Sequence, residues 1–220
     1  MKVCIVGNSS GLLKSELGTE IDKHDIVIRI NFKPFSSLLA KGYEKHIGTK
    51  TDIISYSFGR NFLKHADKIN PGNGIRELLI SNKYEIWLPL PNQSRFNEML
   101  STGVDPNNVK INKVTTYQNI IDTVYNSWWR KIPSCGISTI MMALDIFKDE
   151  DISIIGFDTN TEKEGREHGY ESHYYEKTIL NDNKPDSYFG HDWHSEGKFI
   201  DKLVEDGKIS WLQVKRDSHE

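Results

Sequence analysis

The chain has 220 residues, of which 37% are hydrophobic and 27% charged, so it can bury a core and is not a disordered polymer. Its 28 lysines and arginines against 31 aspartates and glutamates give a net charge of −3, without the basic excess of a dedicated nucleic-acid-binding protein. No stretch approaches the roughly 18 apolar residues of a membrane span. Two cysteines, Cys4 and Cys135, are too few for a disulfide scaffold. We therefore expect a soluble protein of a reducing compartment.

Short runs rich in β-branched residues recur along the chain and predict strands. The runs are 3–6, 26–30, 52–56, 85–90 and 152–157. Between several of them lie stretches of helical character, and a further helix is expected later in the chain; these are 62–68, 93–100, 118–129, 137–147 and 193–205. The alternation predicts an α/β fold with a mainly parallel central sheet flanked by helices. Sites in such folds gather at the carboxyl ends of the strands.

One segment interrupts this alternation. Residues 158–190 show little hydrophobic periodicity, many charges and a cluster of histidines and tyrosines. A loop of this length in a compact domain is usually either functional or disordered. We expect it to be a lid that closes over a bound donor, with a plain insertion as the alternative.

The first two strands each lead into a polar turn. Gly7-Asn8-Ser9-Ser10-Gly11 follows the first strand, and the glycines and the next helix start could hold an anion there. The spacing is not GxGxxG, so a dinucleotide site is not indicated. Asn31 ends the second strand, where it would face the same sheet edge as Asn8. The alternatives are a turn without a ligand and, for Asn31, a simple turn former.

A third patch, Pro133-Ser134-Cys135-Gly136, precedes the amphipathic run 137–147. Ser134 fits a helix N-cap and Gly136 allows close approach, so a carboxylate or phosphate could sit on this helix start. Cys135 could be a nucleophile with a lowered pKa, or an inert small side chain. We favour the inert interpretation.

The fourth patch consists of His173-Tyr174-Tyr175-Glu176 and His191-Asp192-Trp193-His194-Ser195-Glu196. Its spacing does not fit a zinc site. Asp192 is a suitable N-cap for the helix at 193–205, so His191 would lie just before the helix N-terminus. The positive end of the helix dipole disfavours the imidazolium there, which would keep His191 neutral and able to accept a proton. Glu196 lies about 140° round that helix from His191, from the helical period. It therefore suits a role in holding the loop or the start of this helix better than a direct pair with His191.

Taken together and in this order, the four patches resemble the sialylmotifs of the eukaryotic-type sialyltransferases, glycosyltransferase family 29. The large motif is CIVGNSSGLLKSELGTEIDKHDIVIRIN (4–31), with IGTKTD (47–52) further on, and the small motif is PSCGISTIMMALDIFKDEDISIIGFD (133–158). HYYE (173–176) resembles motif III, and HDWHSE (191–196) resembles the very small motif, His-x4-Glu. Residues 56–128 match no motif. The resemblance implies a single nucleotide-binding domain over 1–220, Rossmann-like or GT-A-like.

The resemblance implies transfer of sialic acid from CMP-sialic acid to a glycan hydroxyl, with inversion and without a metal or another cofactor. It makes His191 the general base and places His173 on the leaving phosphate, where an imidazolium would stabilise the developing charge. The donor-binding residues that it implies are Asn8, Ser9, Asn31, Ser134, Gly136, Gly156, Phe157 and Tyr174. The supporting residues are Glu196, Tyr175 and Glu176.

Several features depart from the animal members of that family. The chain begins at the large motif, and the positions of the family's disulfide are Val3 and about Asp149 here. We therefore expect a soluble, cytoplasmic, bacterial- or viral-like member without anchor, stem or bridge. Its expected acceptor is galactose or GalNAc of a surface polysaccharide or a lipid-linked oligosaccharide, with peripheral contact to the inner membrane face as an option. No nucleic-acid partner is expected. The alternatives are another CMP-ulosonic acid donor, such as CMP-Kdo, and a non-catalytic nucleotide- or glycan-binding module.

Overall fold

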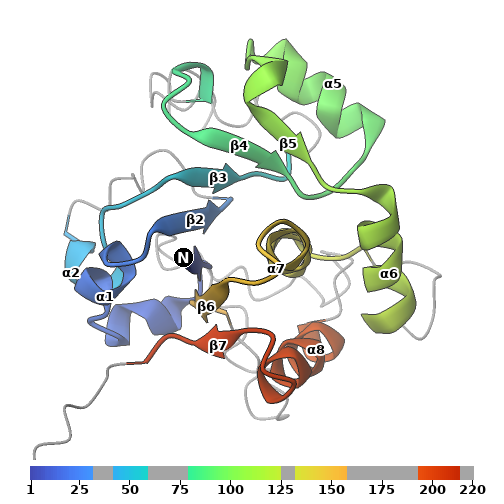
Figure 1. The fold of residues 1–220 in the computed structure, drawn as a ribbon. Coiled ribbons are helices and arrows are strands. Elements are labelled where there is room, and N and C mark those ends of the chain that lie inside the picture. The colour runs from blue at the N-terminus through green and yellow to red at the C-terminus, as the bar shows by residue number, and fades with distance from the viewer. Residues whose placement is uncertain (32–41, 59–78, 125–131, 158–192, 214–220) are drawn as a thin grey trace, which may run out of the picture.

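A computed structural model describes residues 1–31, 42–58, 79–124, 132–157 and 193–213 (Figure 1). Seven strands form one sheet: β1 (Lys2–Val6), β2 (Ile26–Ile30), β3 (Ile53–Ser55), β4 (Glu85–Leu88), β5 (Val109–Ile111), β6 (Asp151–Ile155) and β7 (Ser210–Trp211). The α-helices with described bounds are α1 (Gly18–Asp22), α2 (Glu44–Ile47), α5 (Gln93–Ser101), α6 (Val114–Val124), α7 (Cys135–Ile146) and α8 (Trp193–Glu205). Two 3₁₀ helices are η1 (Ser10–Lys14) and η3 (Pro106–Asn108).

The strands are ordered β5-β4-β3-β2-β1-β6-β7, and each of these neighbouring pairs is parallel. The chain therefore moves outward from β1 to β5 and then returns to the other side of β1. Where the order reverses, Val6 pairs with Ile155, so β1 and β6 end at the same level. Ligands of doubly wound sheets bind outside the carboxyl ends of the strands at this kind of switch point. The predicted α/β class with a parallel sheet is confirmed.

Successive apolar side chains of a strand point to opposite faces of the sheet, and helices cover both faces. Val3 and Ile5 pack with α6, α7 and α8 on one face, whereas Cys4 and Val6 pack with η1, α1 and α2 on the other. Further along, α5 packs with β3 and β4 through Met99 and its neighbours. The sheet is thus buried on both faces, which explains why the five predicted strands read as short continuous apolar runs.

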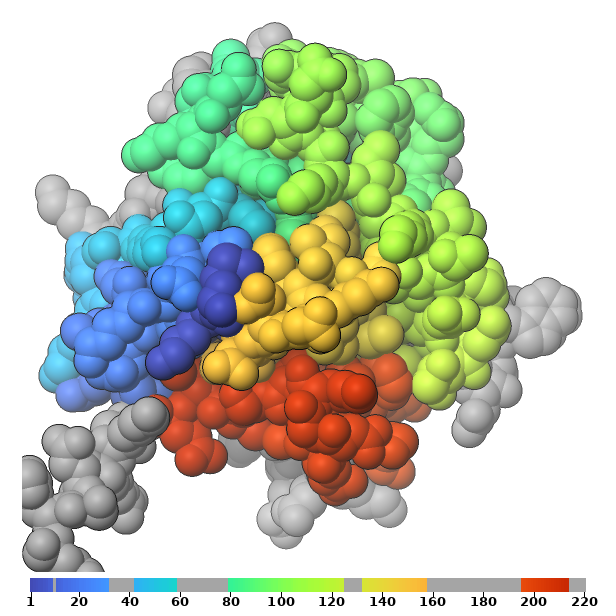
Figure 2. All heavy atoms as spheres, in the orientation of Figure 1, coloured from blue at the N-terminus to red at the C-terminus, as the bar shows by residue number. Residues whose placement is uncertain are grey.

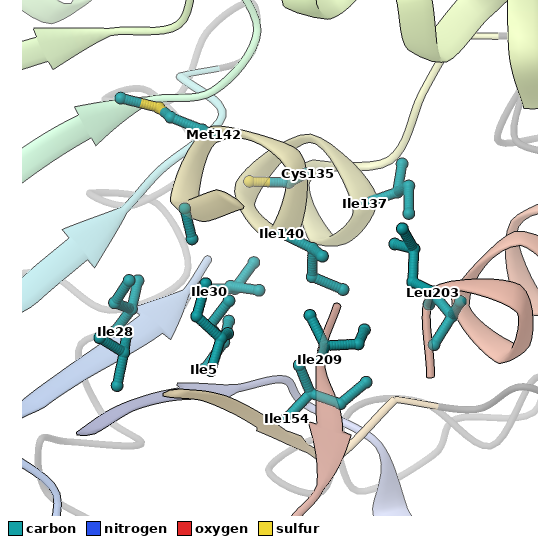
Figure 3. Packing of buried hydrophobic residues seen from close by; sticks show 14 of the residues in the cluster. Ile5, Ile28, Ile30, Cys135, Ile137, Ile140, Met142, Ile154, Leu203 and Ile209 are labelled. Atoms are coloured by element: carbon teal, nitrogen blue, oxygen red, sulfur yellow. The ribbon is translucent and has the colours of Figure 1, made fainter. Parts of the chain in front are cut away.

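Helix α7 contributes many residues to the larger core. On the face drawn in Figure 2, the yellow segment that contains α7 lies between the blue N-terminal residues, the green residues of α6 and the red residues of α8. In Figure 3, Ile137 and Ile140 of α7 lie among the sheet residues and Leu203 of α8. The sequence predicts an amphipathic helix at 137–147, but buried positions run through most of the helix. The reason is that α7 touches the sheet, α6 and α8 together, so little of it is left for solvent.

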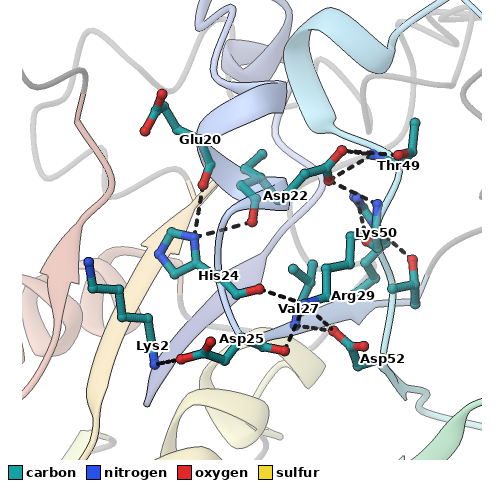
Figure 4. A network of polar contacts seen from close by, with 12 residues as sticks. Lys2, Glu20, Asp22, His24, Asp25, Val27, Arg29, Thr49, Lys50 and Asp52 are labelled. Carbon is teal, nitrogen blue, oxygen red and sulfur yellow. Dashed lines mark hydrogen bonds and ion pairs between the residues drawn. The ribbon is translucent and has the colours of Figure 1, made fainter.

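A polar network ties α1 to the segment between α2 and β3 (Figure 4). The Asp22 carboxylate accepts hydrogen bonds from the backbone amides of Thr49 and Lys50, at 2.9 Å each, and from the Thr49 hydroxyl. Arg29, 6% exposed, donates to the carbonyls of Ile47 and Lys50 and to the Thr51 hydroxyl. We call this the Asp22–Arg29 network. The network explains why the segments EIDKHDIVIRIN (20–31) and IGTKTD (47–52) occur together, because the second segment supplies the backbone groups that the side chains of the first one bind.

Candidate functional site

The switch point is built from backbone at Gly7 and Gly156. The Gly7 amide donates to the Ile155 carbonyl at 2.8 Å, and the Ser9 amide donates to the Gly156 carbonyl at 3.0 Å. A Cβ on Gly7 would lie 2.2 Å from the Gly156 oxygen, so no side chain fits there. Gly156 itself has φ of +76°, which disfavours other residues. The turn after β1 therefore lies against the turn after β6.

The helix that follows the turn after β1, whose start the sequence predicts as a possible anion site, is the short 3₁₀ helix η1. The Ser9 hydroxyl caps η1 by accepting from the Gly11 amide at 3.1 Å. The next α-helix, α1, begins only at Gly18 and has five residues. Any anion here would have to be held by the turn amides and side chains, because no long helix starts at this point.

The structure brings Asn8 and Asn31 to neighbouring strand ends, as the sequence predicts. The Asn8 side-chain amide donates to the Ile30 carbonyl at 2.6 Å, which joins the end of β1 to the end of β2. Asn31 has φ of 44°, in the left-handed region that asparagine tolerates. Its side-chain oxygen accepts from the Ser57 amide at 2.9 Å, so Asn31 in turn joins β2 to the residues after β3. Asn31 is thus a turn former and a residue of the carboxyl edge at once.

The start of α7 is held by Ser134 and Glu196. Ser134 is the N-cap, with its hydroxyl accepting from the Ile137 amide at 3.2 Å. The Glu196 carboxylate, 3% exposed, accepts from the Ser134 amide at 2.8 Å and from the Ser134 hydroxyl at 2.5 Å. The sequence predicts that Glu196 holds the loop or the start of its own helix, whereas in the structure it binds the N-cap of α7. The Glu196 carboxylate therefore occupies the amide and hydroxyl donors of Ser134, at the helix start where the sequence predicts a substrate carboxylate or phosphate.

Phe157 links the two glycine positions of the site. A Cβ on Gly7 would lie 3.3 Å from one edge atom of its ring, and a Cβ on Gly136 would lie 3.1 Å from another. The ring therefore fills the space between the turn after β1 and the first turn of α7. The predicted donor-binding residues Gly136, Gly156 and Phe157 thus lie together with Gly7 at the switch point.

Cys135 is not a candidate nucleophile. Burial raises the pKa of its thiol to about 12, and hydrogen bonds from Thr139 and Ser55 and the charge of Arg95 only partly oppose this. Its carbonyl accepts from the Thr139 hydroxyl, which also bonds the Ser55 hydroxyl at 2.6 Å. Cys135 and Cys4 are both buried, free thiols. The structure therefore supports the inert interpretation.

Sequence reasoning missed Arg95, in the first turn of α5. Its guanidinium Nη1 donates to the Ser57 carbonyl, so it reaches the carboxyl edge of the sheet from the turn after β4. Residues 56–128 carry no recognised motif, so the one sequence signal for Arg95 was its position shortly after the predicted strand 85–90.

Several predicted residues lie outside the described residues. They are His173, Tyr174, Tyr175, Glu176, His191, Asp192 and the proposed lid at 158–190. Within the described ranges, no group of three or more His, Cys, Asp or Glu side chains could hold a metal ion. In the same ranges no helix is both long and apolar enough to cross a membrane.

A doubly wound sheet with glycine turns at its switch point is the arrangement of a nucleotide-binding α/β protein. The family model of glycosyltransferase family 29 (sialyltransferase) matches residues 1–208. The chain therefore belongs to this family.

Similar proteins agree with this membership. The chain is 24% identical over 189 residues to the chicken CMP-N-acetylneuraminate-beta-galactosamide-alpha-2,3-sialyltransferase 1, covering 80% of this chain and 47% of that protein. It is 29% identical over 215 residues to the rat CMP-N-acetylneuraminate-beta-1,4-galactoside alpha-2,3-sialyltransferase, covering 91% and 54%. The chain thus spans about half the length of these relatives.

A crystal structure of a mammalian sialyltransferase in complex with Gal-beta-1-3GalNAc-ortho-nitrophenol has a similar fold. The TM-score is 0.63 at 19% identity, and the match covers 96% of this chain and 69% of that one. At this identity the likeness shows the fold, which agrees with the sheet described above.

Proposed function

We propose that this protein transfers sialic acid from CMP-sialic acid to a glycan hydroxyl by a single inverting displacement. The observation that carries the proposal is the match of the family 29 model over residues 1–208. The fold supports it, because motif residues far apart in the sequence meet at one sheet edge. Those residues are Asn8, Asn31, Ser134, Gly136 and Gly156.

In this proposal the donor lies across the switch point. The phosphate lies over the turn at Asn8 and Ser9, whose backbone and side chains can donate hydrogen bonds, with Asn31 beside it. The donor sugar and cytidine lie at the start of α7, where Gly136 leaves room for close approach. Phe157 shapes this end of the site by its packing between the two glycine turns.

The chemistry follows from the two motif histidines, His173 and His191. The acceptor oxygen attacks the anomeric carbon while His191 takes the hydroxyl proton. The bond from the anomeric carbon to the phosphate oxygen breaks, and CMP leaves with the electron pair. CMP needs no strong acid, so a cationic His173 beside the phosphate is sufficient to stabilise the charge. No step in this scheme requires a metal ion or another cofactor.

The first experiment is CMP release from CMP-N-acetylneuraminic acid in excess EDTA, with and without galactose- or GalNAc-terminated acceptors. Release that the acceptor stimulates and that survives EDTA is the expected result. CMP release from CMP-Kdo but not from CMP-N-acetylneuraminic acid would show that the donor is CMP-Kdo and not CMP-sialic acid. Binding of CMP without turnover of either donor would favour a binding module, and absence of CMP binding would overturn the proposal.

The role of His191 is tested in the same assay. His191→Ala should lower turnover at least about a hundredfold, the usual share of a general base, with CMP affinity retained. The matched control is His219→Ala, because His219 lies beyond the residues that the family model matches. Equal turnover of the two variants would contradict the assignment. Detergent-solubilised lipid-linked and free oligosaccharides, compared as acceptors, test the lipid-linked acceptor and the peripheral membrane contact.

A further inference from the structure

A chain of polar contacts runs along the carboxyl edge of the sheet from β1 to α5. Asn8 joins the end of β1 to Ile30, and Asn31 binds the amide of Ser57 after β3. Arg95 then donates to the carbonyl of the same Ser57. The contacts therefore connect the turns after four strands, and they end in a positive charge.

The charge of Arg95 also reaches the other face of the sheet. Burial is the main cause that raises the pKa of Cys135, at the first residue of α7, and of Tyr117 in α6, and the Arg95 charge opposes it in both cases. Arg95 therefore lies close enough to both helices to act on them electrostatically. The geometry agrees, because Ser55, two residues before the Ser57 that Arg95 contacts, bonds the Thr139 hydroxyl of α7 at 2.6 Å. The end of β3 that Arg95 reaches therefore lies against α7, where the proposed function places the donor sugar.

Arg95 differs from Arg29 in how its donors are used. Both side chains are at least half-buried, but Arg29 makes at least four hydrogen bonds, to backbone carbonyls and to Thr51. Among the residues that the structure describes, Arg95 makes one hydrogen bond, to Ser57, and no ion pair with a carboxylate. A guanidinium has five N–H donors in a planar fork that matches a carboxylate or phosphate. A ligand anion would compensate the partly desolvated charge of Arg95.

Binding of a substrate carboxylate at the start of α7 would be helped by a nearby cation. Because Glu196 already occupies the Ser134 amide and hydroxyl, the helix N-terminus has fewer donors left for a substrate carboxylate than its capping sequence suggests. A cation at Ser57, on the strand end that lies against α7, would supply additional attraction for a substrate carboxylate.

We propose that Arg95 binds an anionic group of the substrate at the α7 end of the site, a carboxylate of the donor sugar or an acidic group of the acceptor. The inference rests on the proposed transfer reaction. It assigns a specificity role to a residue outside the four motifs, on α5.

The test uses Arg95→Gln, which keeps a donor for the Ser57 carbonyl, and Arg95→Lys, which keeps the charge. The control is Lys110→Gln, which removes an exposed cation of β5 that pairs with Glu85 at 3.0 Å. Calorimetry measures the affinity for CMP and for a non-transferable, fluorinated CMP-sialic acid that retains the sugar carboxylate. This readout needs no turnover, so it is independent of whether the wild type is active.

If the anion belongs to the donor, Arg95→Gln should weaken binding of the fluorinated donor about tenfold or more while the affinity for CMP changes less than about twofold. Arg95→Lys should recover part of the loss, and the control should match the wild type. If the anion belongs to the acceptor, donor affinity should be unchanged and KM should rise for a sialylated acceptor but not for a neutral galactoside.

Two results would overturn the inference. One is unchanged donor affinity together with unchanged KM for both acceptors. The other is an equal loss of CMP and donor affinity in Arg95→Gln, which would show that Arg95 only supports the fold around Ser57. A wild type that binds neither CMP nor the fluorinated donor would instead refute the proposed function, and the inference with it.

Discussion

Motif residues occur in two polar regions of the molecule, the Asp22–Arg29 network and the carboxyl edge of the sheet, and they make different kinds of contact in each. In the Asp22–Arg29 network, side chains bind backbone groups of a neighbouring loop and close that part of the chain on itself. At the carboxyl edge, Asn8, Asn31 and Glu196 each join separate strands or helices and surround the glycine turns. One family motif therefore contains both scaffold and site, and a motif match alone does not say which of its residues would touch a ligand.

The largest expected effect is on the scaffold. Arg29→Met removes every donor to the Ile47 and Lys50 carbonyls while keeping a long side chain, so we expect a loss of about 4 kcal/mol in the free energy of unfolding. Urea denaturation measures it. The matched control is Lys23→Met, which breaks only an exposed ion pair with Glu20 and should leave the midpoint unchanged. Similar midpoints for both variants would show that the Asp22–Arg29 network does not stabilise the scaffold.

A smaller effect on stability is expected at the edge. Glu196→Gln keeps the shape but replaces one acceptor oxygen by a donor, so it can no longer serve both the amide and the hydroxyl of Ser134. We expect a loss of about 2 kcal/mol in stability, together with weaker CMP binding, because α7 begins at this contact.

Ser134→Ala provides the comparison for Glu196→Gln. It leaves the backbone amide to the carboxylate but also removes the cap on the Ile137 amide, so it should cost at least as much. A Glu196→Gln protein as stable as the wild type would show that the tie between α8 and α7 is not what holds the edge.

The smallest effect distinguishes the two thiols, one in each region. Burial is the main cause that raises the pKa of Cys4 and of Cys135 from 9.0 to about 12, with Arg29 opposing it in the first case and Arg95 in the second. Both thiols should resist alkylation in the folded protein at about pH 8.5 and react after unfolding. Each thiol has a higher pKa in the folded protein than in the unfolded chain, so the unfolded chain loses its thiol protons first as the pH rises. The free energy of unfolding should therefore fall between pH 9.0 and about 12.

Single Cys4→Ala and Cys135→Ala variants separate the two contributions. Each should remove part of the alkaline loss of stability. Rapid labelling of Cys135 in the folded protein would reopen its role as a nucleophile.

The sequence was sufficient for the fold where burial leaves a clear pattern. All five strands with β-branched runs are present, whereas β5 and β7 were not predicted because β5 is largely exposed and β7 has two residues. Helix α8 occupies 193–205, as predicted from its N-terminal signals.

The site was predictable only along the strands. Asn8 and Asn31 meet because both follow parallel neighbours, and that rule needs no knowledge of packing. The contact of Ser134 with Glu196 joins residues 62 positions apart, and no periodicity encodes it. The position of Arg95 could not be predicted because its contact with Ser57 depends on how α5 lies relative to the end of β3.

The tie between Glu196 and Ser134 has a consequence for length variation. Residues 158–192 lie between Phe157, which is packed against Gly7, and α8, which is fixed to α7 by Glu196. Both ends of this stretch are therefore anchored to the same small region. The entropy of closing a loop between fixed ends grows only logarithmically, by about 0.6 kcal/mol for each doubling of length. A change in the length of chain between Phe157 and α8 should therefore cost the contacts of Phe157 and Glu196 little stability.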